Sequence, residues 1–301
     1  MVVVAVGVGV VWSALRGSGD RGPTGAGAGS AEATPSAATA TPTPTPTPTP
    51  GPTLAATPSP ADPGLAEALA AVVAAAEAAT GADLGVAALA AGGDRPAVAG
   101  GWTTGHAWST VKVPLAIAAL DAGVDGAGAF AQAAITMSDN DAAWSLWNGL
   151  GAGDAAGSAV EAVLAAGGDT ATTVQRTQAR PEYTPFGQTT WTLEDQARFA
   201  AHWPAGAAAA QVWALMGQVD PSQRWGLGRF DGARFKGGWG PDDGGHTVRQ
   251  FGVVAVPGGC TALAVGASAA TFEAGVSALD DLAARLMAMA DGLPAGECPV
   301  R

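Results

Sequence analysis

The sequence predicts an α+β fold in which one antiparallel sheet, formed from both ends of the globular part, is packed with helices beside an all-helical subdomain. Two observations support this. Short alternating apolar stretches separated by glycine turns occur at both ends of the globular region, and only helical patterns lie between them. The order helix, two strands, helical middle, three strands, helix is typical of a single sheet with helices on its faces.

Three parts are predicted along the chain: an apolar membrane anchor or signal segment (1–16), a disordered Thr/Pro-rich linker (17–63) and the globular domain (64–301). The first segment is short for a spanning helix and lacks a basic start, so the frayed tail of a cytosolic protein is the alternative. The linker repeats Thr-Pro up to Pro50 and favours extended polyproline II. An anchor followed by a stalk predicts an exported, membrane-anchored or secreted protein at the bacterial cell surface.

Composition excludes several function classes. The 301 residues, 48% of them hydrophobic, can build one sizeable core. A net charge of −12 and the lack of any basic run argue against a nucleic-acid partner. Two cysteines and three scattered histidines offer no ligand spacing, so we expect no metal and no cofactor. We expect a monomer.

The N-terminal elements of the domain follow from local pattern. Residues 66–80 form an alanine-rich helix that ends at Gly81. Residues 83–91 alternate like a strand, and the glycine turn after them leads into a second strand at 96–101.

A helix is then predicted to begin near Ser109, because Pro114 is tolerated only within about the first turn of a helix. Ser109 and Lys112 therefore lie three residues apart, on one face of the helix at its N-terminal end. A hydroxyl there becomes a nucleophile if a neutral amine accepts its proton, and a partly dry pocket favours the neutral amine. The alternative is a capping serine beside a solvated lysine.

The middle of the domain is predicted to be helical. Ser138-Asp139-Asn140 precedes a helix with Trp144 and Trp147 directed inward, and capping alone would explain this triplet. The other expected elements are short helical pieces over 120–135, helices at 159–166, 189–202 and 208–219, and an irregular stretch at 170–188.

The C-terminal elements are three strands and a helix. A short strand at 232–235 leads into Lys236-Gly237-Gly238-Trp239-Gly240. Strands at 247–256 and 260–267 form a hairpin, and 272–290 is an amphipathic helix. That helix, returning antiparallel to the last strand, brings Cys298 near Cys260. We expect a disulfide in an exported domain, with two free buried thiols as the alternative.

Ser-x-x-Lys, Ser-Asp-Asn and a Lys-Gly motif, in this order, make the chain resemble the penicillin-recognising serine enzymes, in particular class A β-lactamases, over about residues 64–301. The resemblance implies a serine β-lactamase/DD-peptidase-like fold. It implies that Ser109 is the acylated nucleophile and Lys112 its base or proton relay. Ser138 would pass a proton towards the leaving nitrogen, and Lys236 would supply positive potential for a substrate carboxylate and bias Ser138. It also places the oxyanion between the backbone N–H groups of Ser109 and Trp239.

By the same resemblance Asn140 holds either the substrate's side-chain amide or the lysine, and Gly238 contacts the substrate. Gly237 departs from the family, which has a threonine or serine there to bind the substrate carboxylate. Arg249 on the next strand would compensate, unless it is a solvated strand charge. The family's deacylating Glu-x-x-Leu-Asn loop is not visible, and Glu182 in that region either positions water or is a surface charge.

These features predict an exported serine hydrolase that forms an acyl-enzyme with a β-lactam or a cell-wall peptide amide. Two alternatives remain: a DD-peptidase-like enzyme without efficient β-lactam turnover, and a catalytically degenerate module that binds cell-wall material or a protein through the same cleft. Trp108 and Trp239, next to the motifs, are candidates to line that cleft.

Overall fold

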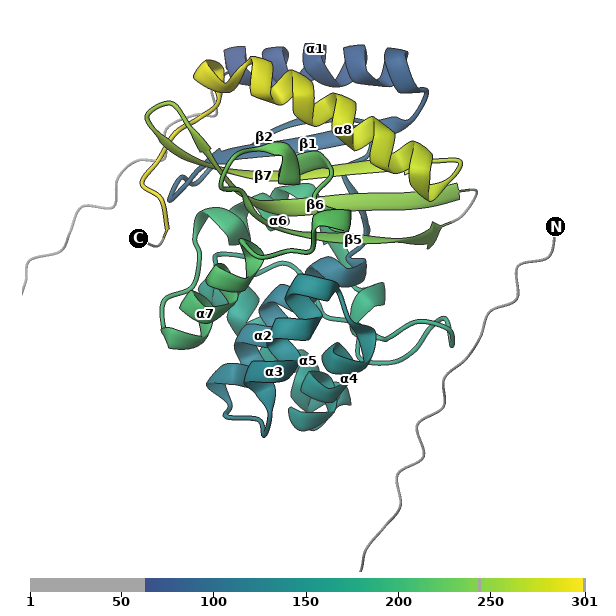
Figure 1. Cartoon of the computed structure of the whole chain (residues 1–301), viewed down its shortest axis with the longest axis vertical. Helices are drawn as coiled ribbons and strands as arrows, with labels where there is room; N and C mark the ends of the chain where they lie inside the picture. The colour runs from purple at the N-terminus through teal and green to yellow at the C-terminus, as the bar shows by residue number, and fades with distance from the viewer. Residues whose placement is uncertain (1–62, 243–244, 300–301) are drawn as a thin grey trace, which may run out of the picture. The chain divides into compact units, whose positions relative to one another are not determined.

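The computed structural model describes residues 63–242 and 245–299. In this part of the chain a five-stranded sheet carries helices on both faces, and a helical subdomain lies against one of those faces (Figure 1). The predicted segments 1–16 and 17–63 lie outside the described residues, apart from Pro63, where the first helix begins.

The sheet has the strand order β2-β1-β7-β6-β5, and every neighbouring pair is antiparallel. Its two N-terminal strands therefore join the three C-terminal strands through the β1–β7 pair, which confirms the predicted sheet built from both ends of the domain. The strand bounds are β1 (Asp83–Ala90), β2 (Ala97–Gly100), β5 (Arg234–Asp242), β6 (Gly245–Val256) and β7 (Gly259–Ala269).

Two apolar cores flank this sheet. Along β1, Leu84 and Val86 enter one core while Ala87 and Leu89 enter the other, as the two-residue period of a strand requires. The first core lies beneath α1 (Pro63–Thr80) and α8 (Phe272–Ala288), which pack on each other and on the sheet. The second core joins the sheet to α6 (Leu193–Ala201) and to the helical subdomain.

The helical subdomain is arranged around α2 (Lys112–Asp121), which is buried from Lys112 to Ala119. A 3-10 turn, η1 (Trp108–Val111), leads directly into it. The helices packed on or near α2 are α3 (Ala127–Gln132), the single π-helical turn η2 (Ala133–Met137), α4 (Asn140–Gly149), α5 (Gly153–Ala166) and α7 (Ala207–Met216).

Two elements differ from the sequence prediction. The strand expected at 232–235 continues through the glycine-rich motif as β5, because β6 pairs with every residue of it up to Asp242. The helix expected from residue 189 begins only at Leu193, with Thr192 as its cap. Residues Thr190–Thr192 instead form β4, which pairs with β3 (Thr104–His106) in a small second sheet.

Helix α1 has the length and the mean hydropathy, 1.2, of a membrane-crossing segment. Leu69, Val73 and Ala76 are buried in the core beneath α1, and the rest of its hydropathy comes largely from alanine.

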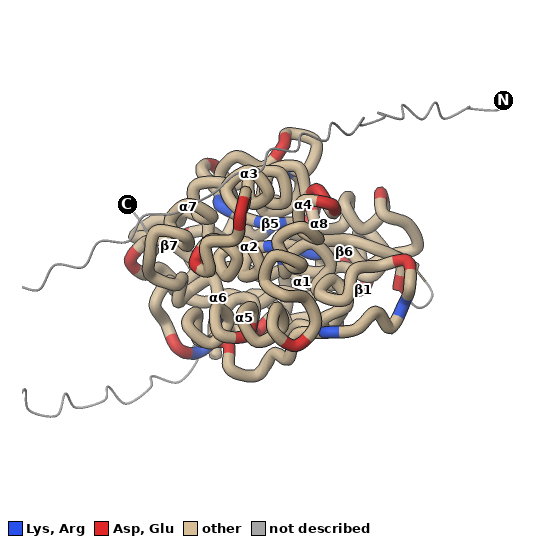
Figure 2. The backbone as a smooth tube through the Cα atoms, turned by 90° about the horizontal axis from the view of Figure 1, so that it is seen from below, with Lys and Arg blue, Asp and Glu red and all other residues tan. Residues whose placement is uncertain are grey.

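Along the described backbone, lysines and arginines are scattered among acidic residues (Figure 2).

Cys260, on β7, and Cys298, beyond α8, form a disulfide, which confirms the predicted pair. Cys260 also exchanges two backbone hydrogen bonds with Gly296. The C-terminal segment is thereby fastened to the beginning of β7.

Replacing both cysteines, Cys260→Ser with Cys298→Ser, is expected to lower the free energy of unfolding by about 2–5 kcal/mol, because the unfolded chain loses a cross-link. Chemical denaturation of the oxidised protein measures this loss, and reduced wild-type protein is the matched control. Two titratable thiols in the unfolded, unreduced protein would contradict the disulfide.

Candidate active site

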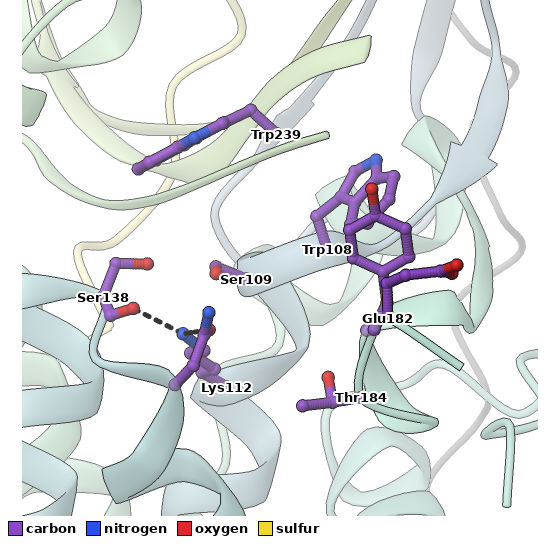
Figure 3. A pocket seen from close by; sticks show the side chains of 10 residues that line it. Trp108, Ser109, Lys112, Ser138, Glu182, Thr184 and Trp239 are labelled. Carbon is purple, nitrogen blue, oxygen red and sulfur yellow. Dashed lines mark hydrogen bonds between the residues drawn. The ribbon is translucent and has the colours of Figure 1, made fainter. Parts of the chain in front are cut away.

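A pocket of about 280 Å³ opens where the end of the sheet meets the helical subdomain. It contains residues from all three predicted motifs, drawn from η1, the turn before α4, and β5 (Figure 3). The lining residues are Trp108, Ser109, Lys112, Ser138, Asn140, Glu182, Tyr183, Thr184, Gly187 and Trp239.

Ser109 is partly exposed at this pocket, on the 3-10 turn η1. The residue before it, Trp108, has a φ of 49°, a left-handed conformation that is unfavourable for a bulky side chain. Such a conformation persists only where neighbouring structure holds it. Two glycines of β5 supply the room: a Cβ on Gly240 would lie 2.5 Å from the Trp108 indole, and one on Gly238 would lie 2.8 Å from the backbone N of Ser109.

Lys112, in the first turn of α2, is almost fully buried and directs its amine into the pocket. Its Nζ donates to the backbone oxygen of Ser138 at 2.6 Å and to Oδ1 of Asn140 at 2.7 Å. Burial lowers the pKa of Lys112 to about 7, and the nearby carboxylate of Asp139 offsets part of that shift. The structure gives no hydrogen bond between Lys112 and Ser109.

Ser138 connects the two lysines of the site. Its φ of 60° and ψ of 29° place it in the left-handed region, and Asp139 after it caps α4 by accepting from the backbone N of Ala142. The backbone oxygen of Ser138 accepts from Lys112, and its hydroxyl accepts from Nζ of Lys236 at 2.9 Å. Asp139 therefore caps the helix as predicted, and the same turn places Ser138 at the pocket.

Lys236, on β5, is fully buried and also donates to the backbone oxygen of Gly237 at 2.9 Å. Burial lowers its pKa well below the ordinary value, and repulsion from Lys112 lowers it further. Because both amines lose stability as cations when they are buried near each other, the site favours having at least one of them neutral.

The predicted site residues fall into two groups: those that lie at the pocket or directly behind it, and those that do not. Ser109, Lys112, Ser138, Asn140 and Trp239 line one pocket. Lys236 lies directly behind Ser138. Two predictions, however, need correction: neither Gly238 nor Arg249 lines this pocket.

Gly238 lies against the backbone of η1 rather than at the pocket. A Cβ there would stand within 3.0 Å of Ala107 O, Ser109 N and Thr110 N. Glycine at this position thus allows the strand to approach the nucleophile's own backbone.

Arg249 is fully buried, so it is neither a substrate ligand nor a solvated strand charge. Its Nη1 donates to the backbone oxygens of Gly105 and His106, at 2.9 and 3.0 Å, on β3. Its Nη2 donates to Trp191 O at 2.9 Å and to Gln196 Oε1 at 2.7 Å. The guanidinium therefore joins the large sheet to both strands of the small sheet, of which β3 leads into η1.

A chain of buried hydrogen bonds continues from Arg249 to the nucleophile segment. Gln196 Nε2 donates to Oγ1 of Thr110 at 2.9 Å, and the Thr110 hydroxyl donates to the backbone oxygen of Ala107. This chain holds η1 on both sides of the left-handed residue Trp108. Sequence reasoning missed it, because Gln196 and Thr110 are 86 positions apart and carry no local pattern.

The irregular segment 170–188 forms the outer rim of the pocket. Arg180 stacks over Tyr183, with 4.5 Å from its guanidinium carbon to the ring centre, and donates to the backbone oxygen of Pro241 at 2.8 Å. Tyr183 in turn meets Trp108 edge to face at 5.0 Å. These contacts fasten the segment to the end of β5.

Glu182 lies on this rim and is exposed, with its carboxylate directed away from Ser109 (Figure 3). Of the tryptophans, Trp108 and Trp239 line the pocket as expected, and Trp147 is buried in the core. Trp144, expected inside, is 37% exposed beside Phe186, so that expectation was wrong.

Solved structures with the same arrangement are β-lactamases. One from Sphaerobacter thermophilus is 23% identical over 76% of this chain and 98% of its own, with a TM-score of 0.57. One from Burkholderia vietnamiensis is 20% identical over 74% and 96%, with a TM-score of 0.59. An ancestral class A β-lactamase is 22% identical over 73% and 99%, with a TM-score of 0.57. The domain has the class A β-lactamase fold. No family model and no curated protein matches the sequence.

Within this β-lactamase fold, the three motifs occupy one pocket at the junction of sheet and helices. The fold comparison and the motif geometry are independent observations, because the first uses the whole backbone and the second a few side chains. Both agree with the resemblance to penicillin-recognising serine enzymes that the three motifs carry.

The polar chain beneath the nucleophile generates a stability prediction. Gln196→Leu is expected to lower the free energy of unfolding by about 2–4 kcal/mol, since it removes a partner of the buried groups of Arg249 and Thr110. Urea denaturation measures the change.

Gln211→Leu is the matched control, because Gln211 is an exposed glutamine on α7 and should change stability by less than about 0.5 kcal/mol. Equal stability of the two variants would mean that the buried chain contributes nothing.

Proposed function

We propose that the domain is an exported serine hydrolase that forms an acyl-enzyme on Ser109 with a β-lactam or a cell-wall peptide amide. The observation that supports this most directly is the state of Lys112. A neutral amine has two N–H donors and one lone pair, and Ser138 O and Asn140 Oδ1 accept both donors. The lone pair is left to accept a proton from a hydroxyl in the same pocket.

In the acylation step, the hydroxyl oxygen of Ser109 attacks the substrate carbonyl carbon while its proton passes to Nζ of Lys112. A catalytic base works best when its pKa lies near the working pH, and burial has brought the pKa of Lys112 to about 7. The missing Ser109–Lys112 hydrogen bond is compatible with this role, because such contacts commonly tighten only when substrate binds.

In the next step the C–N bond breaks and the leaving nitrogen needs a proton. The Ser138 hydroxyl lies between the pocket and Lys236, and it is the group assigned to this transfer. Ser138 gives its hydroxyl proton to the nitrogen, and the proton that Lys112 received from Ser109 then restores the Ser138 hydroxyl and returns Lys112 to its neutral form. The backbone N–H groups of Ser109 and Trp239 are the proposed donors to the developing oxyanion. In comparable sites each donor lowers the activation free energy by about 3 kcal/mol.

Hydrolysis of the acyl-enzyme requires an activated water. Glu182 faces away from Ser109, so no carboxylate among the lining residues is aimed at the ester carbon. This favours slow deacylation and supports the alternative of a DD-peptidase-like enzyme without efficient β-lactam turnover. A non-catalytic module that binds cell-wall peptides through the same pocket is the second alternative.

Export is part of the proposal and rests on the sequence outside the described residues, together with the disulfide. A structural disulfide is typical of oxidising compartments outside the cytosol. The apolar N-terminal segment would attach the chain to a membrane, and the Thr/Pro-rich linker would hold the domain away from it.

Acylation is tested by intact mass spectrometry after incubation with a penicillin and, separately, with an activated ester. We expect a covalent adduct on Ser109 that persists because deacylation is slow, and none in the Ser109→Ala variant. Rapid turnover of the penicillin would support an efficient lactamase. Failure of every β-lactam and activated ester to label Ser109 would contradict the enzymatic proposal.

The rate of acylation is expected to rise with pH below about 7 and to level off above it, because only the neutral form of Lys112 accepts the proton. Below that point the rate should fall about tenfold per pH unit. Stopped-flow measurement of ester cleavage across the stable pH range tests this, with Ser109→Ala giving the background. A flat profile would exclude Lys112 as the base.

A further inference from the structure

The charges around the pocket are unusual for a site that would receive an anion. Two charged side chains line it: Lys112, whose amine is held by two oxygen acceptors, and the carboxylate of Glu182 at the rim. Because burial lowers the pKa of Lys112 to about 7, its positive charge is largely lost once the pH rises above that value.

The wall formed by β5 is aromatic. Trp239 lines the pocket and packs against Phe272 at 5.4 Å and Trp225 at 6.1 Å between ring centres. Gly237, beside it, has no side chain, and a Cβ there would lie 3.4 Å from the Trp225 ring. This wall therefore offers neither a hydroxyl nor a cation to a substrate group.

The nearby cations are engaged elsewhere. Lys236 and Arg249 are each 0% exposed. Lys236 donates to Ser138 and Gly237, and the Nη atoms of Arg249 donate to carbonyl groups of β3 and β4 and to Gln196, while its Nε is buried without a hydrogen-bond partner. Arg180 stands outside the pocket on Tyr183, with Asp242 4.0 Å from its guanidinium. A substrate carboxylate in this pocket would lose hydration without gaining an ion pair with Lys236, Arg249 or Arg180.

We infer that the site prefers acyl compounds that are uncharged beside the scissile bond, such as neutral esters, thioesters and amides, over compounds with a free carboxylate there. An uncharged group gains by burying apolar surface against Trp239, whereas a carboxylate finds no cation in the pocket lining other than Lys112. The inference rests on the proposed function for its chemistry. Within the proposed function it ranks internal or amidated peptide bonds and neutral esters above β-lactams and peptides with a free carboxylate beside the scissile bond, which would acylate Ser109 more slowly.

A matched pair of thioesters tests the preference. N-acetyl-D-alanyl thioglycolate and N-acetyl-D-alanyl thioglycolamide differ only by a carboxylate against a carboxamide on the leaving group. At pH 8 we expect kcat/KM for thiol release to be at least about tenfold higher for the carboxamide, which corresponds to about 1.4 kcal/mol. An equal or higher value for the carboxylate would overturn the inference.

A pair of variants at the wall separates charge from shape. Trp239→Arg and Trp239→Leu both remove the indole and keep the backbone N–H, but only the first adds a cation. We expect Trp239→Arg to favour the carboxylate substrate by about tenfold relative to Trp239→Leu. Identical substrate ratios in the two variants would show that this wall does not decide the preference.

The overall charge of −12 would also repel an anion, but through solvent, so that salt screens it. The wild-type preference should therefore persist between about 0.15 and 0.5 M salt, where the screening length falls below about 8 Å. A preference that disappears in high salt belongs to the surface charge and would overturn the inference about the pocket.

Binding to the Ser109→Ala variant keeps this inference separate from the proposed function. N-acetyl-D-alanyl-glycine and its glycinamide are titrated while the fluorescence of the pocket tryptophans is followed. Tighter binding of the glycinamide without any adduct on Ser109 in wild type would reject the enzyme and support the preference. Equal binding of the two, or binding of neither, would reject the preference even if Ser109 is acylated.

Discussion

Ser138 is the residue on which the site depends, because it holds two buried amines from two different parts of the fold. Its backbone oxygen accepts from Lys112 of the helical subdomain, and its hydroxyl accepts from Lys236 of the sheet. A single left-handed residue makes both contacts possible, since that conformation turns the carbonyl and the side chain toward different elements. The junction of the two parts of the domain is thereby also the centre of the pocket.

Two amines so placed constrain each other. Neither has a salt-bridge partner among the described residues, and each loses hydration on burial. Their mutual repulsion rises as the surroundings become drier. The neutral form of at least one lysine is therefore a property of the folded domain rather than of any substrate, and a base at neutral pH follows from the packing itself.

The sequence predicted those parts of the fold that have local causes. The strand pairs follow from alternation and turns, the position of Ser109 and Lys112 follows from Pro114, and the disulfide follows from the antiparallel return of the last helix. Local reasoning was also right that Ser138-Asp139 caps a helix.

Features that depend on distant partners were not predicted. Arg249 is a charged residue on a strand, where a solvent-exposed side chain is a natural expectation. It is instead buried, and its hydrogen-bond acceptors lie 53 to 144 residues away in the sequence, where no motif indicates them. Strand β4 has only three residues, too few for a recognisable alternating pattern, so the sequence predicts a helix there. Its pairing with β3 defines it as a strand. Trp144 has the spacing of a core residue, but its side chain is 37% exposed beside Phe186.

The glycine-rich strand β5 shows how these constraints divide along one element. Residues of a strand alternate between its faces. Gly238 and Gly240 face η1, where any side chain would strike the backbone of Ser109 or the ring of Trp108. Gly237 and Trp239 face the opposite way, toward Trp225 and Phe272.

Positioning of the nucleophile and the chemistry of the pocket wall are therefore carried by alternate residues of the same strand. Changes at Gly238 would disturb the backbone that holds Ser109, whereas changes at Trp239 alter the side chain that a substrate meets and leave that backbone in place. Under the proposed function, a fold shared with β-lactamases keeps one acylation apparatus while its wall is adapted to a different substituent. The departure at Gly237 then belongs to the second set of residues, and it is separate from the apparatus formed by Ser109, Lys112 and Ser138.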